Sequence, residues 1–490
     1  MKKLIFAFSL GLAFFASGEY IVLNEDNDHY FKLEPEMMDV PHLEAYVDRL
    51  ARGGKVTHIF FCPTGQRASF DSKVWEPIWT GLQEYPENEI WHLFLRWSKN
   101  AKALHDKGID PYKVWIDRCR KRGISPWLTP RMNDCHDGAA DLSKPYRSIT
   151  LWRQRKDLRC YPGYDKPSWG HHHFNYEHKE VRDSALAMLA ELFERYDFDG
   201  IEIDGGIWFP KERAQECASL MDEFFREIKK MAMQWEKKRG HRILIAAKIA
   251  HEPNLCRRLG CDVSKWVRQG IVDWVVCPNA YEVPVEKWRS EFGERKDAKV
   301  LCGLNYAYHP GRNLPRSLIT GDMYRGWADA CWGRGADGLY LHNLQYHPVE
   351  QAEIADKGLS KESLNCMMRS YPALWGLPLE VEKGGDLRFA AGANTAGEIT
   401  LELAFADAVP EQLKIGLNGV SGTFLRDGIK TDWWREEIDK SNRLVSSLKS
   451  KIYKFPSGSV KNGVNTLKVE PGSKATLVRA EIFIAPGRGN

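Results

Sequence analysis

Short apolar runs alternate with longer segments of helical pattern through the first three quarters of the chain. Helix-like stretches such as "DPYKVWIDRCRKRG" and "EVRDSALAMLAELFERYD" separate the runs. Alternation of strand and helix is typical of a parallel sheet, because each parallel connection has to cross back over the sheet. The apolar runs begin at Val56, Ile124, Ile201, Ile243, Val272, Lys299 and Asp337.

An eighth strand is expected between Ile149 and Tyr176, where "HHHFNYEHKEVRD" resembles a strand end that leads into a helix. Eight strand–helix units over roughly 320 residues favour a closed (β/α)8 TIM barrel with long loops. The alternative is an open, doubly wound sheet. No G-x-G-x-x-G motif follows the first run, which disfavours a dinucleotide-binding sheet.

The pattern changes after about Gly376. Segments such as "EITLELAFA" and "ATLVRAEIFIA" alternate apolar and polar residues and are separated by Gly, Asn and Pro. This alternation predicts antiparallel strands. We therefore expect an α/β barrel over residues 19–375 and a C-terminal antiparallel β-sandwich over residues 376–490, with one face of the sandwich packed against the barrel.

The first residues, "MKKLIFAFSLGLAFFASGEY", have the layout of a secretory signal peptide: two Lys, an apolar stretch and then small residues. The apolar stretch is too short to span a bilayer, and no later segment is apolar enough to do so. We expect residues 1–18 to be removed by cleavage near Gly18. The mature protein is then expected in the periplasm or outside the cell.

Composition excludes some functions. The chain has 70 Lys and Arg against 66 Asp and Glu, and no dense basic stripe, so nucleic acid is not an expected partner. Among the 11 Cys there is no C-x-x-C pair, which argues against a structural zinc ribbon. The spacing of Cys256 and Cys261 leaves open whether they pair, and the sequence leaves the oligomeric state open.

The carboxyl ends of the strands are the places where a parallel barrel meets its substrate. Polar residues at the ends of the expected strands would form a ring of hydrogen-bonding groups, which suits a polyhydroxylated substrate, with tryptophans near the loops able to stack on sugar faces. The candidate substrate-binding residues of this ring are Arg67, Arg131, Asn133, Asp134, Asn175, Trp208, Lys248, His251, Asn279, Tyr281, Asn305, His342 and Asn343.

Two carboxylates in the run "IEID" need an explanation, because a carboxylate in a buried strand is costly unless it is paired or used. Strand periodicity places Glu202 and Asp204 on the lumen side, about 7 Å apart along the strand. Asp204 stands at the rim and is the first catalytic candidate. Glu202, also a candidate for substrate binding, lies a layer deeper, where pairing with Lys248 or Arg131 is favoured over contact with substrate. A buried ion-pair network is the alternative for both carboxylates.

Three stretches have a recognisable pattern: "LHDKGIDPYKVWIDRCRKRGISPWLTPRMND", "NYEHKEVRDSALAMLAELFERYDFDGIEID" and "VDWVVCPNAY". They resemble the glycosyl-hydrolase-like 10 family, secreted bacterial proteins thought to be TIM-barrel glycosidases. The resemblance covers roughly residues 40–350 and implies a barrel with glycosidase activity. "FDGIEID" is also similar to the fourth-strand motif of family 18 chitinases, but Gly206 stands where their catalytic Glu would fall. Glycosidase clans with an Asp nucleophile at the tip of strand four place it at the position of Asp204, and their acid follows strand six.

Glycoside hydrolysis generally needs a second carboxyl group to protonate the leaving oxygen. Glu282, just after the sixth strand, is the first choice, and Asp134 is the second. The sequence therefore predicts an exported glycoside hydrolase of poly- or oligosaccharides, with Asp204 and Glu282 as catalytic residues and no cofactor or metal. The sugar, the linkage and the stereochemical outcome stay open.

Two other functions remain open. One is a non-catalytic carbohydrate-binding protein on a degenerate barrel, which the glycine at position 206 and the uncertain acid would suit. The other is a metal-dependent hydrolase that uses His171–His173. Three adjacent residues on a strand cannot all point toward one ion, so this second alternative is disfavoured.

Overall fold

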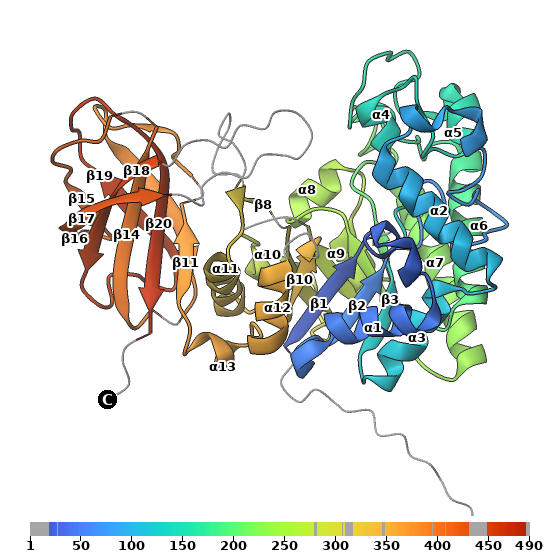
Figure 1. Cartoon of the computed structure of the whole chain (residues 1–490), viewed down its shortest axis with the longest axis horizontal. Coiled ribbons are helices and arrows are strands. Elements are labelled where there is room, and N and C mark those ends of the chain that lie inside the picture. The colour runs from blue at the N-terminus through green and yellow to red at the C-terminus, as the bar shows by residue number, and fades with distance from the viewer. Residues whose placement is uncertain are drawn as a thin grey trace, which may run out of the picture.

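The computed structural model describes most of the chain after residue 18. The described residues are 19–26, 28–278, 282–305, 307–308, 317–344, 348–373, 375–393, 395–406, 408–430 and 448–486. A closed barrel of eight parallel strands is followed by antiparallel sheets, which confirms the predicted fold class (Figure 1). The expected signal peptide, Asn279 and Tyr281 lie outside the described residues.

The barrel closes where its first and last strands pair, with Tyr20 opposite Gly338 and Asn24 opposite His342. Its strands are β1 (Tyr20–Glu25), β2 (His58–Phe61), β3 (Ser125–Leu128), β4 (Gly200–Asp204), β5 (Leu244–Lys248), β6 (Trp274–Cys277), β7 (Lys299–Leu304) and β10 (Gly338–His342). Its helices are α1 (Val40–Leu50), α2 (His92–Asp106), α3 (Pro111–Lys121), α4 (His136–Ala140), α5 (Thr150–Gln154), α6 (Lys179–Arg195), α7 (Ala218–Arg239), α8 (Pro253–Arg258), α9 (Val263–Arg268), α10 (Val285–Glu291), α11 (Gly321–Gly333), α12 (Pro348–Lys357) and α13 (Lys361–Leu364).

One of the eight strands was predicted in the wrong place. The segment from Ile149 to Tyr176 contains no strand; it holds α5, a 3-10 turn and a single bridge between Arg159 and Phe174. The segment forms part of a long loop after β3. In this loop the Trp152 indole donates a hydrogen bond to the His172 carbonyl (2.8 Å). The missing strand is β1, which directly follows the apolar stretch of the expected signal peptide.

Helix α3 shows how local sequence produces the outer layer of the barrel. The Asp110 side chain accepts hydrogen bonds from the first backbone N–H groups of the helix, and Pro111 occupies its first turn. The apolar residues Tyr112, Trp115 and Cys119 follow at helical spacing and are buried. The helix therefore presents one apolar face to the barrel and to α1.

The lower part of the barrel lumen is filled by aromatic rings. Trp127 stacks on Phe60 with ring centroids 4.6 Å apart and lies 4.7 Å from Trp274. A Cβ at Gly200 would lie 2.4 Å from the Trp127 ring, so only glycine leaves room for the indole beside β4. Strand periodicity then carries the lumen-facing side of β4 from Gly200 to Glu202 and Asp204.

The C-terminal part consists of two main antiparallel sheets around a separate apolar core. Their orders are β11-β20-β14-β18-β17, with β12 beside β20, and β13-β19-β15-β16. The strands are β11 (Arg369–Pro372), β12 (Leu379–Glu380), β13 (Gly385–Ala391), β14 (Glu398–Phe405), β15 (Ile415–Leu417), β16 (Val420–Ser421), β17 (Thr423–Lys430), β18 (Leu448–Phe455), β19 (Gly463–Val469) and β20 (Thr476–Ala485). Within the barrel part of the chain, between β7 and β10, β8 (Ala307–Tyr308) and β9 (Ser317–Leu318) form a small antiparallel pair.

Helix α11 joins the barrel to the C-terminal sheets, which lie beside it in Figure 1. Asp329 on this helix accepts hydrogen bonds from the Tyr371 hydroxyl (2.7 Å) and the Gly392 N–H (3.1 Å). A Cβ at Gly326 would lie 2.0 Å from the Ser370 carbonyl oxygen, so the helix and β11 are in close contact. This contact agrees with the expected packing of the sandwich on the barrel. Within the described residues, no helix is both long enough and apolar enough to cross a membrane.

Candidate functional site

A polar cavity of about 610 Å³ opens at the carboxyl ends of the barrel strands. We call it the mouth cavity. It collects residues that are far apart in the sequence, from the loops after β1, β2 and β3 and from the ends of β7 and β10. Among the residues predicted from the sequence, Arg67, Arg131, Asp134, Asn305, His342 and Asn343 line it.

Arg131 is the centre of the ion pairs in the mouth cavity. Its Nη2 lies 2.5 Å from Asp26 Oδ2 and its Nη1 lies 3.4 Å from Asp134 Oδ2. Burial would raise the pKa of Asp134, but the neighbouring His136 and Arg131 outweigh it and hold that pKa below its usual range. The Nδ1 of His136 lies 2.7 Å from the same carboxylate. Asp134 is therefore an anion that fixes Arg131 and His136.

Asp26 is a cavity residue that sequence reasoning missed. It follows β1, the strand that was not predicted, and lies in the mouth cavity with Arg131. The signal was present in "YIVLNED", where an apolar run ends in a cluster of polar residues. Read as a strand, this segment would have placed a carboxylate at the barrel mouth.

Asp204 stands at the end of β4, opposite Lys248 on β5. Lys248 Nζ lies 3.1 Å from Asp204 Oδ2, and the Lys248 side chain is only 5% exposed, whereas that of Asp204 is 23% exposed. Burial would lower the pKa of Lys248, but the Asp204 and Glu202 carboxylates outweigh it and raise that pKa. Lys248 therefore keeps its positive charge in spite of its burial, and Asp204 is the solvent-facing member of the pair.

Asp204 is connected to the mouth cavity through the backbone of Arg131. The two residues form a parallel bridge, and the Met132 N–H donates to the Asp204 carbonyl (3.0 Å). Asp204 also contributes to raising the pKa of Arg131, against the effect of burial and after the larger effect of Asp26. The cavity lining itself contains Arg131 but not Asp204, Lys248 or Glu202.

Glu202 is fully buried below this pair. Its Oε1 accepts hydrogen bonds from the Thr129 hydroxyl (2.6 Å) and the Tyr340 hydroxyl (2.8 Å), while Oε2 has no hydrogen-bond partner among the described residues. Burial raises the pKa of Glu202 to about 7, although the Lys248 charge acts in the opposite direction. The expected ion pair with Lys248 or Arg131 is thus replaced by two hydroxyl donors, and full burial leaves no access for a substrate.

Several predicted binding residues are outside the described lining of the mouth cavity and make contacts within loops. Asn133 donates to the carbonyls of Phe174 (2.9 Å) and Ile207 (2.7 Å), and Asn175 accepts from the Glu177 N–H (3.0 Å). The His251 carbonyl accepts a hydrogen bond from the Trp288 indole (3.1 Å).

Trp208 is not available as a sugar platform in this structure. It is fully buried and packs edge-on against Tyr176, with ring centroids 4.7 Å apart. No face of its indole is left for a sugar ring. The exposed tryptophans at the mouth cavity are Trp91 and Trp169 instead, which are 40% and 58% exposed.

Glu282 has a partner of its own. Its Oε1 lies 2.6 Å from Nη1 of Arg334, a residue that follows α11 and also pairs with Glu286 at 2.8 Å. Glu282 is not among the residues that line the mouth cavity. Neither Glu282 nor Asp204 is in the described lining of the mouth cavity, so the role of Glu282 stays a prediction.

The three adjacent histidines have separate partners. His171 lies 2.6 Å from the Ser168 hydroxyl, and His172 Nε2 lies 2.7 Å from the Lys166 carbonyl. Burial lowers the pKa of His173 to about 4. The rings do not converge, which removes the geometric basis for a metal site at His171–His173.

One group in the described part of the chain does have converging ligand atoms. The side chains of Asp26, Asp28 and His29 place them within 4.8 Å of one another. However, Asp26 is paired with Arg131 and Asp28 with Lys32, so the two carboxylates already have cationic partners. The 11 cysteines, including Cys256 and Cys261, are all free thiols.

Comparisons with known proteins find fold similarity only. No family model matches the chain, and a comparison with curated proteins found no match. The resemblance to the glycosyl-hydrolase-like 10 family therefore stays a prediction.

Solved structures of similar fold include several glycoside hydrolases. A maltogenic α-amylase from Thermotoga neapolitana has a TM-score of 0.39 and 12% identity, with 94% of this chain and 99% of that one covered. An endo-β-1,4-mannanase from Thermotoga petrophila has a TM-score of 0.43 and 10% identity, covering 94% and 97%. An α-L-fucosidase from Paenibacillus thiaminolyticus has a TM-score of 0.41 and 12% identity, and this match covers 72% of this chain but only 51% of that one. Likeness at this level says nothing of substrate or mechanism.

Proposed function

We propose that the protein is a glycoside hydrolase that acts on a poly- or oligosaccharide at the mouth of its barrel. The observation that carries the proposal is the partly exposed Asp204 carboxylate at the end of β4, held by the buried Lys248 beside a polar cavity. The exposed indoles of Trp91 and Trp169 border the same cavity. Hydroxyl-binding polar groups and flat aromatic faces are what a sugar ring requires.

Asp204 is proposed as the nucleophile or as the base that activates water. An ammonium group 3.1 Å away stabilises negative charge on the carboxylate, which suits attack on a sugar carbon or deprotonation of water rather than donation of a proton. Burial of Lys248 strengthens this interaction, because the charge pair is only partly screened by water.

Asp26 is proposed as the second carboxylate. It lines the mouth cavity and binds the Arg131 side chain, whose backbone pairs with Asp204. Asp134 is less suited to proton donation, because His136 and Arg131 hold its pKa low. Glu282, the choice from the sequence, is the alternative acid.

A second function is favoured by one specific observation. The carboxylates that line the described mouth cavity are all in ion pairs: Asp26 and Asp134 with Arg131, and Asp28 with Lys32. Fully paired carboxylates fit a carbohydrate-binding protein that lacks a general acid. Such a protein would retain polysaccharides without cleaving them.

The test is hydrolysis by the purified protein of starch, cellulose, β-mannan, xylan and chitin, together with aryl glycosides, measured as reducing ends or released phenol. We expect cleavage of at least one substrate, and a loss on the order of a thousandfold or more in Asp204→Asn with polysaccharide binding retained. Asp273→Asn is the matched control. Asp273 is paired with Arg242 at 2.6 Å at the start of β6, the opposite end of the barrel, so its loss should lower stability and leave turnover per folded molecule unchanged.

Two results would overturn the assignment. An Asp204→Asn variant with near-normal turnover and a lower melting temperature would make Asp204 part of a structural ion pair. A wild-type protein that binds a polysaccharide in the panel and cleaves nothing would support the binding function instead.

We also propose that the protein is exported, on the basis of the signal-peptide pattern in residues 1–18. Mass spectrometry of the protein from its host should then find a mature N-terminus near Glu19. An intact N-terminal segment would contradict export by this route.

A further inference from the structure

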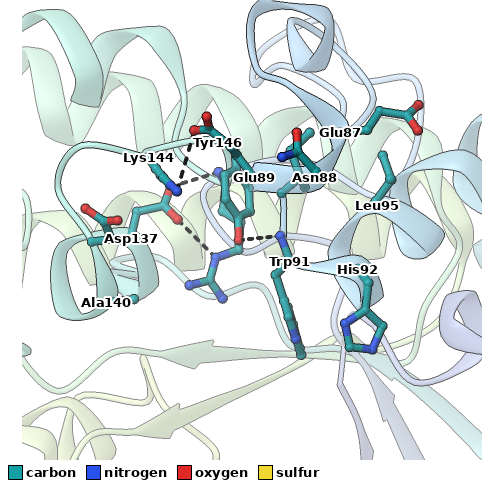
Figure 2. A pocket seen from close by; sticks show the side chains of 13 residues that line it. Glu87, Asn88, Glu89, Trp91, His92, Leu95, Asp137, Ala140, Lys144 and Tyr146 are labelled. Atoms are coloured by element: carbon teal, nitrogen blue, oxygen red, sulfur yellow. Dashed lines mark hydrogen bonds and ion pairs between the residues drawn. The ribbon is translucent and has the colours of Figure 1, made fainter. Parts of the chain in front are cut away.

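A second hollow, of about 460 Å³, lies next to the mouth cavity. One side is the 3-10 turn Glu87–Glu89 with the start of α2, and the other is α4 with the loop that follows it (Figure 2). Trp91 and Arg147 line both this hollow and the mouth cavity. The two spaces therefore share a wall, and a molecule longer than one cavity can extend from one into the other.

The shared wall is held in place from several sides. The backbone N–H of Trp91 donates a hydrogen bond to the Tyr146 hydroxyl (3.1 Å), across the hollow (Figure 2). The backbone N–H and Nε of Arg147 donate to the Asp137 carboxylate at 2.8 and 3.0 Å. These contacts fix the wall before any ligand binds, which lowers the entropic cost of binding.

The chemistry of the hollow fits a neutral glycan. Trp91 is 40% exposed and offers an aromatic face, and Asn88, Lys144 and His92 offer hydrogen-bonding groups. The carboxylates of the turn Glu87–Glu89 line the same space, but Glu87 is paired with Lys99 (2.9 Å) and Glu89 with Lys144 (3.5 Å). The lining therefore has no excess of positive charge that would select uronic or sulfated sugars.

We propose that this hollow is a distal subsite, in which one end of a neutral polysaccharide chain binds while the other end occupies the mouth cavity, with Trp91 between them. This inference rests on the proposed glycoside hydrolase function. It adds that the natural substrate is a chain rather than a mono- or disaccharide. Trp91 is a specificity residue that contacts the substrate away from the bond that is cleaved.

Trp91→Ala tests the subsite through substrate length. The probes are the polysaccharide that the wild type cleaves fastest and the aryl monoglycoside or shortest oligosaccharide of the same sugar. We expect kcat/KM on the polysaccharide to fall about tenfold and that on the short substrate to fall by a clearly smaller factor, because Trp91 borders both spaces but only the long chain also occupies the hollow. Trp91→Phe should restore most of the activity on the polysaccharide.

Trp375→Ala is the matched control, because Trp375 is also 40% exposed but lies next to the C-terminal sheets, bridged to Arg388 on β13. It should leave both substrates unchanged. An equal loss on long and short substrates in Trp91→Ala, or no loss on either, would overturn the subsite.

Affinity gel electrophoresis distinguishes failure of the subsite from failure of the proposed function. It measures how strongly a neutral polysaccharide or polygalacturonate in the gel retards migration of the protein. If the wild type cleaves nothing but Trp91→Ala abolishes its retardation by a neutral polysaccharide, the hydrolase fails and the subsite stands. If cleavage occurs and Trp91→Ala neither weakens retardation nor changes the length preference, the subsite alone fails. Stronger retardation by polygalacturonate than by every neutral polysaccharide would overturn the assignment of a neutral ligand.

Discussion

The two ends of the barrel lumen are built from the same eight strands but hold opposite kinds of side chain. The lower end is a stack of aromatic rings around Trp127, with Phe60 and Trp274 in contact. The upper end holds Glu202 and Lys248, with the Tyr340 hydroxyl bound to the carboxylate. The two ends are separated only by position along the strands. On β4, Gly200 lies beside the Trp127 ring, and the next residue on the same face is Glu202.

This difference indicates where stability resides and where it is lowered. Stacked rings contribute apolar burial and dispersion with no buried charge. A buried carboxyl group with one oxygen that lacks a hydrogen-bond partner costs free energy, and so does a buried ammonium group. Parallel barrels generally bind substrate at the carboxyl ends of their strands, so the costly groups lie at the end where a substrate site is expected. The following predictions separate the two ends.

The largest expected effect on stability belongs to the lower end. Trp127→Ala removes a fully buried indole that contacts Phe60 and Trp274, and should lower the free energy of unfolding by about 3–5 kcal/mol. Turnover per folded molecule should stay near that of the wild type. Urea unfolding, with activity normalised to the folded fraction, checks both statements.

Trp127→Phe, which keeps one ring in the stack, should lose less stability and serves if the alanine variant does not fold. A loss of kcat as large as that of Asp204→Asn in the folded fraction of either variant would show that the two ends do not act separately.

At the upper end, Glu202→Gln should change how stability depends on pH. Burial raises the pKa of Glu202 from 4.5 to about 7, so the folded protein keeps a proton that the unfolded chain loses between these values. The resulting stabilisation is present below pH 4.5 and is lost as the pH rises through about 7. Glutamine does not titrate, so the variant should gain stability relative to the wild type by up to about 3 kcal/mol between pH 4.5 and pH 8.

Urea unfolding of both proteins across this pH range measures the difference. Glu402→Gln on β14 is the control, since its carboxylate also accepts a hydrogen bond from a hydroxyl, that of Ser450 (2.7 Å), but lies in the sandwich. A constant difference between Glu202→Gln and the wild type at all pH values would contradict a buried, protonated Glu202.

The sequence was sufficient for most of the fold because strand and helix periodicities are local. The apolar runs from Val56 onward all became barrel strands, and the alternation after Gly376 became antiparallel sheets. β1 was missed because only Ser17, Gly18 and Glu19 separate its apolar residues from the apolar stretch of the expected signal peptide, a gap too short to mark a separate strand. Asp26 directly follows β1, so it was absent from the predicted site as well.

The site was only partly predictable, since its contacts depend on loops. Strand period two placed Asp204 at the tip of β4, and the pairing of β4 with β5 explains its contact with Lys248. No periodicity indicates the path of the long loops that carry Trp91 and Trp169 to the mouth cavity. For the same reason, nothing local showed that Glu282 meets Arg334, which is 52 residues further along the chain.

The smallest effect is expected for Glu282→Gln. If Glu282 serves only its ion pair with Arg334, the variant should lose about 1 kcal/mol of stability or less, because the pair is partly exposed. Its turnover should stay within about threefold of the wild type. Glu286→Gln is the matched control, since Glu286 pairs with the same Arg334 at 2.8 Å.

Asp26→Asn, in contrast, should lower turnover by about a hundredfold or more, as loss of an acid or base catalyst does. The decisive measurement compares natural glycosides with aryl glycosides that carry good leaving groups, which need little protonation. If Glu282→Gln loses a hundredfold or so on natural glycosides and little on the aryl ones, while Glu286→Gln loses neither, then Glu282 is the acid and the assignment of Asp26 is wrong.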